Sequence, residues 1–328
     1  MSLPEKLIAV DLATYCQGFH RAAESWPPLP LADAPELVWW QQLIGSSVSG
    51  VLQGQPLLSA LEASLPQLRL PQVEGISGSE LYKALVLRGE AADAVTLHWQ
   101  QPEALKLWIA PHPCGATPVL QSPSWSDFEQ LVCALAHRSE PLALADGVHA
   151  QAVNGLIHWE LIRQFGRQSR ARLIVLHEAP YGSVPARHVP GDLSDAGWLA
   201  ASTTLRLEHE LTHLATKNLL GEMRLNLLDE LIADCMGMVA ALGCFDADLF
   251  SRCLGIDADH GRWISYTREL SEPEARQAVA LVIIRSRELE QRLAELPWLL
   301  EPPQAMQCLQ WLCLQRLDQP ISSVTAVA

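Results

Sequence analysis

One short segment, residues 209–213 (His-Glu-Leu-Thr-His), constrains the fold of this chain more than any other part of it. It lies inside a run with helical periodicity, where residues four apart share one face. His209 and His213 are therefore about 6 Å apart at the backbone, and their ring nitrogens can converge on one cation. About 0.04 such segments are expected by chance in a chain of this composition. The alternative is an ordinary helix face that carries two solvated or hydrogen-bonded histidines.

A second helical segment carries two acids, Glu230 and Asp234, which also lie four residues apart on one face. At about 1.5 Å of rise per residue, an antiparallel hairpin returns Glu230 to the level of His213. One turn further on, Asp234 arrives beside His209. Two acids and two histidines buried together need an ion to compensate them. The alternative for the two acids is a solvated acidic face.

These side chains predict a metal site with His209, His213 and Glu230 as ligands. An open fourth position beside three protein ligands is typical of catalytic zinc. Asp234 is predicted to hold the ring of His209 in its metal-binding tautomer. Glu210 points about 100° away from His209 around the helix, so it reaches a metal-bound water rather than the metal. We therefore expect zinc (Zn²⁺) as the cofactor and Glu210 as a general base.

The pattern of apolar residues predicts an α+β fold that is mostly helical, with a small sheet in the middle of the chain and an all-helical carboxy-terminal part. Residues 172–178 are the clearest strand, and residues 95–99 and 105–110 are two further candidates. The predicted organisation is a helical amino-terminal region (1–92), an α+β core (93–243) and a helical carboxy-terminal region (244–328).

Local signals place several helix ends. Asp246 is typical of a helix N-cap, and residues 271–274 (Ser-Glu-Pro-Glu) form a capping box with proline in the first turn. Gly89, Gly221 and Gly243 indicate breaks after helices. Helical patterns cover residues 4–25, 34–60, 79–87, 126–136, 148–165, a stretch from Ser202 or Thr203 to 220, and residues 222–242, 271–296 and 303–317.

The composition limits the partners of the chain. Its 23 basic and 37 acidic residues give a formal charge of −14, which repels phosphate backbones and anionic lipid headgroups, so we expect no nucleic-acid partner. The apolar stretches are too short for a membrane span, and the amino terminus lacks the pattern of a secretion signal. Eight scattered cysteines without a Cys-x-x-Cys pair favour free thiols in a reducing, cytoplasmic setting.

Residues 209–213, together with the later Glu230 and Asp234, resemble the signature of the gluzincin group of zinc metallopeptidases, H-E-x-x-H plus a downstream E-x-x-x-D. The resemblance covers residues 172–243 and implies the same zinc ligands, general base and orienting aspartate as the spacing does. It also implies a zincin-like sheet packed on the H-E-x-x-H helix, an edge strand that accepts substrate backbone, and a peptide or protein substrate. Sixteen residues separate His213 from Glu230, somewhat fewer than in thermolysin-like members, so we expect a tight interhelical loop.

Hydrolysis also needs a donor for the developing oxyanion. Side chains on either side of the two helices are the candidates: Tyr181, His188, His260, Arg262 and Tyr266. We rank His260 first, because the aspartates at 257 and 259 favour its protonated form, and Tyr266 second. The alternative for each is a surface or capping role.

The leading hypothesis is thus a zinc metallopeptidase that cleaves peptide or amide bonds with activated water. One rival is a zincin-like protein that binds metal with little or no catalysis, in which residues 1–170 act as an interaction module. A second rival is an α-helical binding protein without a metal. Metal content and the activity of a Glu210→Gln variant separate the three hypotheses.

Overall fold

The computed structural model describes residues 10–45, 50–91, 95–144, 147–169, 171–256 and 261–323. The chain forms two compact units: a helical unit, Met1–Pro27 with Pro180–Ala328, and a sheet unit, Pro28–Ala179. The expected fold class is confirmed, because the chain is mostly helical, contains one mixed five-stranded sheet and has a helical carboxy-terminal part. The unit bounds differ from the three consecutive regions that we predicted. The sheet and the helix that carries residues 209–213 belong to different units.

The sheet has the strand order β1-β2-β3-β5-β4. Only the β3–β5 pair is parallel among the pairings described, with Val119 opposite Ile174. The strand predicted at 172–178 is confirmed as β5, but it is an interior strand that pairs with both β3 and β4. It therefore has no free edge for a substrate backbone. The strands are β1 (Val51–Gln53), β2 (Lys106–Ala110), β3 (Thr117–Ser122), β4 (Ala150–Leu156) and β5 (Ala171–His177).

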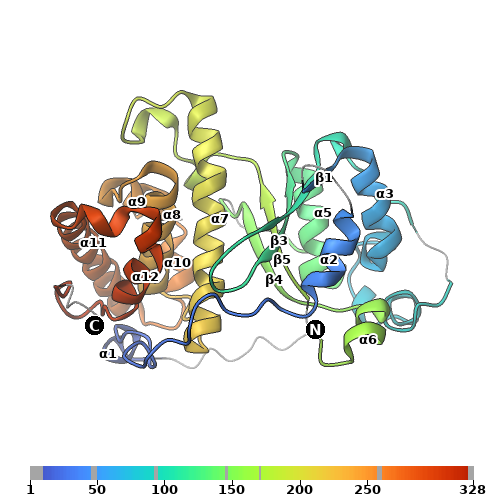
Figure 1. Ribbon diagram of the computed structural model, residues 1–328, viewed down its shortest axis with the longest axis horizontal. Coiled ribbons are helices and arrows are strands. Elements are labelled where there is room, and N and C mark those ends of the chain that lie inside the picture. Colours follow the sequence, from blue (N-terminus) through green and yellow to red (C-terminus); the bar gives the residue numbers. More distant parts are fainter. Residues whose placement is uncertain are drawn as a thin grey trace. The chain divides into compact units, whose positions relative to one another are not determined.

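Helices α2, α3 and α5 pack on this sheet (Figure 1). Their apolar side chains, with Trp40, Phe128 and Leu120 at the centre, form a continuous buried core with those of the strands. Such burial is the main source of stability for a unit of this kind. The helices of the sheet unit are α2 (Leu37–Ile44), α3 (Gly54–Ser64), α4 (Glu80–Tyr82), α5 (Trp125–Ala136) and α6 (Trp159–Phe165), with the short 3₁₀ helices η1 (Pro66–Arg69), η2 (Ile76–Gly78) and η4 (Pro102–Ala104) and the π-helix η3 (Lys83–Arg88).

Several predictions in the sheet unit are wrong. The helical pattern at 148–165 is strand β4 followed by α6, because the segment pairs with β5 and this tertiary pairing overrides local propensity. Residues 95–99 form no strand; the amides that follow, of Gln100 and Gln101, donate instead to the buried carboxylate of Asp127 at 2.7 and 2.9 Å. The helix predicted at 34–60 is divided into α2, β1 and α3.

The helical unit is organised around α8, which packs against α7, α11 and α12 (Figure 1). The N-caps at Asp246 and Ser271 are confirmed, whereas the first predicted helix shrinks to α1 within the described residues. The helices of this unit are α1 (Leu12–Tyr15), α7 (Asp195–Leu220), α8 (Leu227–Leu242), α9 (Ala247–Leu254), α10 (Trp263–Tyr266), α11 (Glu272–Glu295) and α12 (Ala305–Cys313), with turns η5 (Tyr181–Ser183), η6 (Ala186–His188), η7 (Pro297–Leu300) and η8 (Pro302–Gln304).

The structure agrees with two further expectations. All eight cysteines are free thiols, and seven of them are buried. Across the described ranges, every helix is too short or too polar to cross a lipid bilayer.

His158 makes the stability of the sheet unit depend on pH. Its ring is fully buried beside Trp39, neither ring nitrogen has a hydrogen-bond partner, and burial lowers its pKa from 6.5 to about 4. The unfolded chain therefore binds the proton more tightly than the folded chain. We expect the unit to lose about 3 kcal/mol of stability as the pH falls from about 6.5 to 4. Urea unfolding across this range should show a smaller loss in His158→Leu; equal losses would contradict the prediction.

Candidate metal centre

Helices α7 and α8 form a tight antiparallel hairpin. Helix α7 begins earlier than predicted, at the N-cap Ser194, whose hydroxyl accepts the amide of Gly197 at 3.1 Å, and it ends at Gly221 in the left-handed conformation. Helix α8 begins after Asn226, whose side chain accepts the amide of Asp229 at 3.0 Å. The predicted short loop is therefore residues 221–226. The hairpin brings the histidine face of α7 against the acidic face of α8.

Gly237 sets how closely the two helices approach. A Cβ atom at this position of α8 would lie 2.6 Å from the backbone oxygen of Leu205 on α7, closer than side chains tolerate. The helices therefore touch through their backbones here, one turn beyond Asp234. This close approach allows the histidine side chains of α7 to meet the carboxylate side chains of α8.

Three side chains meet at one point between the helices: His209, His213 and Glu230. The two Nε2 atoms are 3.1 Å apart, Glu230 Oε1 is 3.3 Å from His213 Nε2, and Glu230 Oε2 is 3.7 Å from His209 Nε2. Bonds of 2.0–2.1 Å to a tetrahedral zinc ion would put ligand atoms about 3.3–3.4 Å apart. The Nε2–Nε2 and Oε1–Nε2 separations are close to these values, and one ligand atom from each of the three residues lies within 4.8 Å of the other two, so the triad could hold a metal.

The other ring nitrogen of each histidine faces a carboxylate of α8. Asp234 Oδ1 lies 2.7 Å from Nδ1 of His209, and Asp229 Oδ1 lies 3.2 Å from Nδ1 of His213. A carboxylate at Nδ1 holds the proton there and leaves Nε2 free to bind a metal. Asp234 lies beside His209, as the helical spacing predicts. The partner of His213 was not predicted; it is Asp229, the residue directly before Glu230 near the start of α8.

The charges of the cluster fit a divalent cation. Asp229, Glu230 and Asp234 are at most 1 % exposed; Glu230 Oε2 and Asp234 Oδ2 have no hydrogen-bond partner, and Asp229 Oδ1 faces only the Nδ1 atom of His213 among the contacts described. Burial raises the pKa of the Glu230 carboxyl, but the two histidines and Arg262 outweigh burial and lower it to about 2. Three buried anions need compensation, which comes from protonated imidazole rings or from a metal ion. The donor set, two imidazoles and a carboxylate, suits the second alternative.

Tyr181 has a different place from the one predicted. Its buried phenol donates to Asp234 Oδ1 and lies 3.0 Å from Nδ1 of His209, on the ring edge opposite the ligand atom Nε2. The Tyr181 hydroxyl is therefore engaged by Asp234 on the Nδ1 side of His209, where it can orient the Asp234 carboxylate. It is in the wrong position to stabilise an oxyanion at an ion held by the triad.

Arg262 and Tyr266 lie on the side of Glu230. The Arg262 guanidinium is 3.6 Å from Glu230 Oε2 and donates to the Tyr266 hydroxyl at 3.0 Å. Burial and the charge of Glu230 raise the pKa of Tyr266, so its phenol stays protonated. The hydroxyl of Tyr15 binds both the carbonyl of Tyr266 and the amide of Leu227 at 2.9 Å, which ties α10 to the start of α8.

The remaining predicted residues are less constrained. Glu210 follows His209 on α7 and is partly exposed, unlike the three ligand candidates. His188 ends η6 as an exposed residue. His260, our first-ranked oxyanion donor, lies outside the described residues. Of the five candidates, Tyr181 thus lies behind His209, and Arg262 and Tyr266 lie on the side of Glu230.

Comparison with known families adds one finding. Residues 5–171 and 167–323 match a family described as "Family of unknown function (DUF7005)". The chain belongs to this family. No curated protein and no solved structure matches it. Membership of DUF7005 covers nearly the whole chain and assigns no chemistry, so the gluzincin resemblance stays a prediction from the motif alone.

The close contact at Gly237 can be tested by adding one methyl group. Helix propensity alone would make Gly237→Ala more stable by about 1 kcal/mol. Because the methyl meets backbone, we expect instead a loss of roughly 1–3 kcal/mol in the free energy of unfolding. The matched control is Gly78→Ala, where the added Cβ meets nothing within 4 Å and little change is expected. A Gly237→Ala variant as stable as the wild type would contradict the close-approach account.

Proposed function

We propose that this protein is a zinc-dependent hydrolase, most directly a metallopeptidase that cleaves peptide or amide bonds. One observation carries the proposal: the buried side chains of His209, His213 and Glu230 each offer one ligand atom, and these three atoms lie within 4.8 Å of one another. Three protein ligands leave a fourth position for water or substrate, as in catalytic zinc sites. The H-E-x-x-H sequence places an acid beside the first ligand.

Zinc would supply Lewis acidity at this point, lowering the pKa of a coordinated water to about 7 and polarising a substrate carbonyl. Two neutral imidazoles and one carboxylate are its usual partners in hydrolases. The charge balance agrees: a divalent ion and Arg262 together offset the three buried carboxylates Asp229, Glu230 and Asp234.

The residues around the triad have separate roles in this proposal. Glu210 takes the proton of the attacking water, because it is partly exposed and holds the acid position of the H-E-x-x-H sequence, directly after the first ligand. Asp229 and Asp234 keep the proton of each ring at Nδ1. Arg262 and Tyr266 offer N–H and O–H donors on the Glu230 side, where they could stabilise negative charge on the substrate oxygen.

A second candidate is a metal-binding protein with little catalysis. The burial of the triad favours it, since the side chains of His209, His213 and Glu230 are at most 5 % exposed. Arg262 also lies within ion-pair distance of a ligand oxygen and reduces the electron density that Glu230 offers a metal. Both candidates predict bound metal, and turnover separates them.

Metal binding should stabilise the helical unit. Protein purified without chelator is expected to hold about one equivalent of zinc by elemental analysis, and its removal should lower the melting temperature. His213→Ala should lose the metal and roughly 3–5 kcal/mol of stability, because Asp229 and Glu230 are then left without their partner. The control His188→Ala changes an exposed imidazole and should keep the metal. A melting temperature unchanged by both chelation and His213→Ala would contradict a buried metal site.

Catalysis should depend on Glu210 without affecting the metal. Glu210→Gln removes the proton acceptor but no ligand, so we expect full zinc content and a loss of about 10²–10⁴-fold in the hydrolysis of a quenched peptide library. Glu208→Gln, the same substitution on the same helical turn, is the control and should retain activity. Full zinc content with no hydrolysis in the wild type would favour the non-catalytic candidate. Wild-type activity in Glu210→Gln would refute the assigned base.

A further inference from the structure

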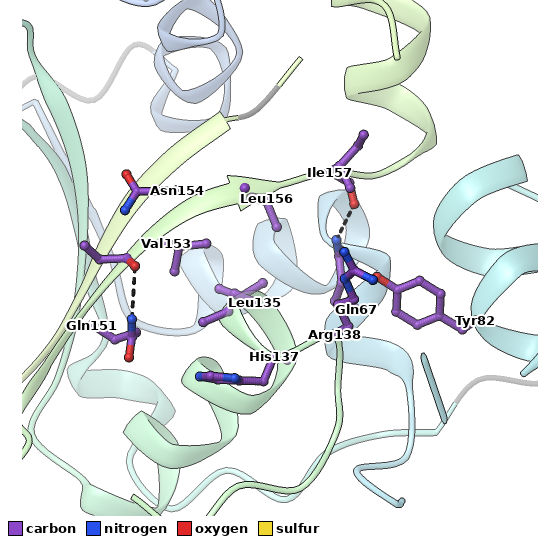
Figure 2. Close-up of a pocket in the computed structure, with 14 residues that line it drawn as sticks. Gln67, Tyr82, Leu135, His137, Arg138, Gln151, Val153, Asn154, Leu156 and Ile157 are labelled. Atoms are coloured by element: carbon purple, nitrogen blue, oxygen red, sulfur yellow. Dashed lines mark hydrogen bonds between the residues drawn. The ribbon is translucent and has the colours of Figure 1, made fainter. Parts of the chain in front are cut away.

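The sheet unit contains a cavity that belongs to no site described above. Its volume is about 260 Å³, and it lies between the carboxy-terminal end of α5, strand β4 and turn η1. A water molecule occupies about 30 Å³ in the liquid, so the cavity has room for roughly nine waters or for a small organic molecule. Figure 2 shows the lining side chains in two groups, with Gln151, Val153 and Asn154 on one side and Gln67, Tyr82 and Arg138 on the other.

Three buried polar atoms in the lining have no hydrogen-bond partner: Gln67 Oε1, His137 Nε2 and Asn154 Oδ1. Gln67 is only 2 % exposed, and its Nε2 donates to the carbonyl of Ile157 at 2.9 Å, as Figure 2 shows. This bond fixes the amide orientation, so the oxygen is the atom left over. Buried polar atoms without partners are costly and uncommon. Their concentration in one cavity indicates that something with hydrogen-bond donors occupies it.

Arg138 supplies the charge of the cavity. It is the permanently charged member of the described lining, which contains no acidic side chain. Arg138 and Ser139 both have positive φ, 56° and 62°, a conformation that residues other than glycine adopt mainly where the surroundings enforce it. Ser139 is held by two bonds, from its amide to Cys133 and from its hydroxyl to the Gln67 carbonyl, at 2.8 and 3.2 Å. The turn thus fixes the backbone of Arg138, an exposed residue at the mouth of the cavity, near Gln67, whose Oε1 has no partner.

We propose that this cavity binds a small carboxylate that carries hydrogen-bond donors, of the size of one amino acid or hydroxy acid. Arg138 would pair with the carboxylate, since a guanidinium matches its two oxygens. The amino or hydroxyl group of the ligand would donate to the oxygens of Gln67 and Asn154. Burial lowers the pKa of His137, which keeps its ring neutral and able to accept or donate one hydrogen bond.

The proposal is independent of the metal centre. All lining residues belong to the sheet unit, whereas the triad belongs to the helical unit. Loss of the metal site therefore leaves this inference standing, and an empty cavity leaves the hydrolase proposal untouched.

Calorimetric titration of the full chain tests the cavity with four probes: glycine, L-serine, L-glutamine and L-lactate. We expect at least one to bind with a Kd below about 1 mM. The methyl ester of the probe that binds lacks the carboxylate charge, and propionate lacks the amino or hydroxyl donor. Each should bind at least about tenfold more weakly than that probe. If none of the four probes binds below about 1 mM, the cavity holds only water and the proposal is wrong.

Variants test whether the probe binds in this cavity, beside Arg138. Arg138→Asn removes the charge while asparagine tolerates positive φ, so the fold is expected to persist and the affinity to fall about tenfold or more. Arg138→Lys keeps the positive charge and should lose less affinity than Arg138→Asn. The control Arg163→Asn removes another exposed arginine of the same unit, on α6 and outside the cavity lining, and should bind as the wild type does. Unchanged affinity in Arg138→Asn would overturn the site.

Discussion

Three carboxylates buried beside two imidazoles are the constraint on which the helical unit depends. The adjacent Asp229 and Glu230 and, one turn later, Asp234 lie on α8 with almost no exposure, and α7 supplies the only histidines described next to them. Charges in such a place need a counter-charge and fixed geometry. The N-cap at Asn226, the glycine at the helix crossing and the bonds of Tyr15 and Tyr181 all serve to hold that geometry.

Helical spacing was enough to find the triad. His209 and His213 share a face by periodicity, and the short loop returns Glu230 and Asp234 to them, so the sequence predicts all four positions. The surrounding shell could not be predicted in the same way. Tyr181 reaches the site from a turn that has no periodicity. Arg262 and Tyr15 come from segments far away in the chain, and only tertiary packing brings them close.

The secondary structure shows the same division: some elements follow from the local sequence, whereas others depend on pairing with distant segments of the chain. Strand β5, helix α5 and the caps at Asp246 and Ser271 follow from local patterns and are confirmed. Strand β3 was missed, since Pro118 and Gln121 obscure its apolar character, and its pairing with β5 supplies the stability that its own residues do not indicate. Pro118 is tolerated because the parallel pairing begins at Val119.

Membership of a family of unknown function leaves the chemistry to the site itself. The central claim is that His209, His213 and Glu230 share one zinc ion. Anomalous scattering from crystals at energies on both sides of the zinc absorption edge tests it most directly. The account predicts a single peak present only above the edge, about 2.0–2.2 Å from both Nε2 atoms and from a carboxylate oxygen of Glu230. No peak at the triad in crystals of protein prepared with zinc, or a peak held by other side chains, would contradict it.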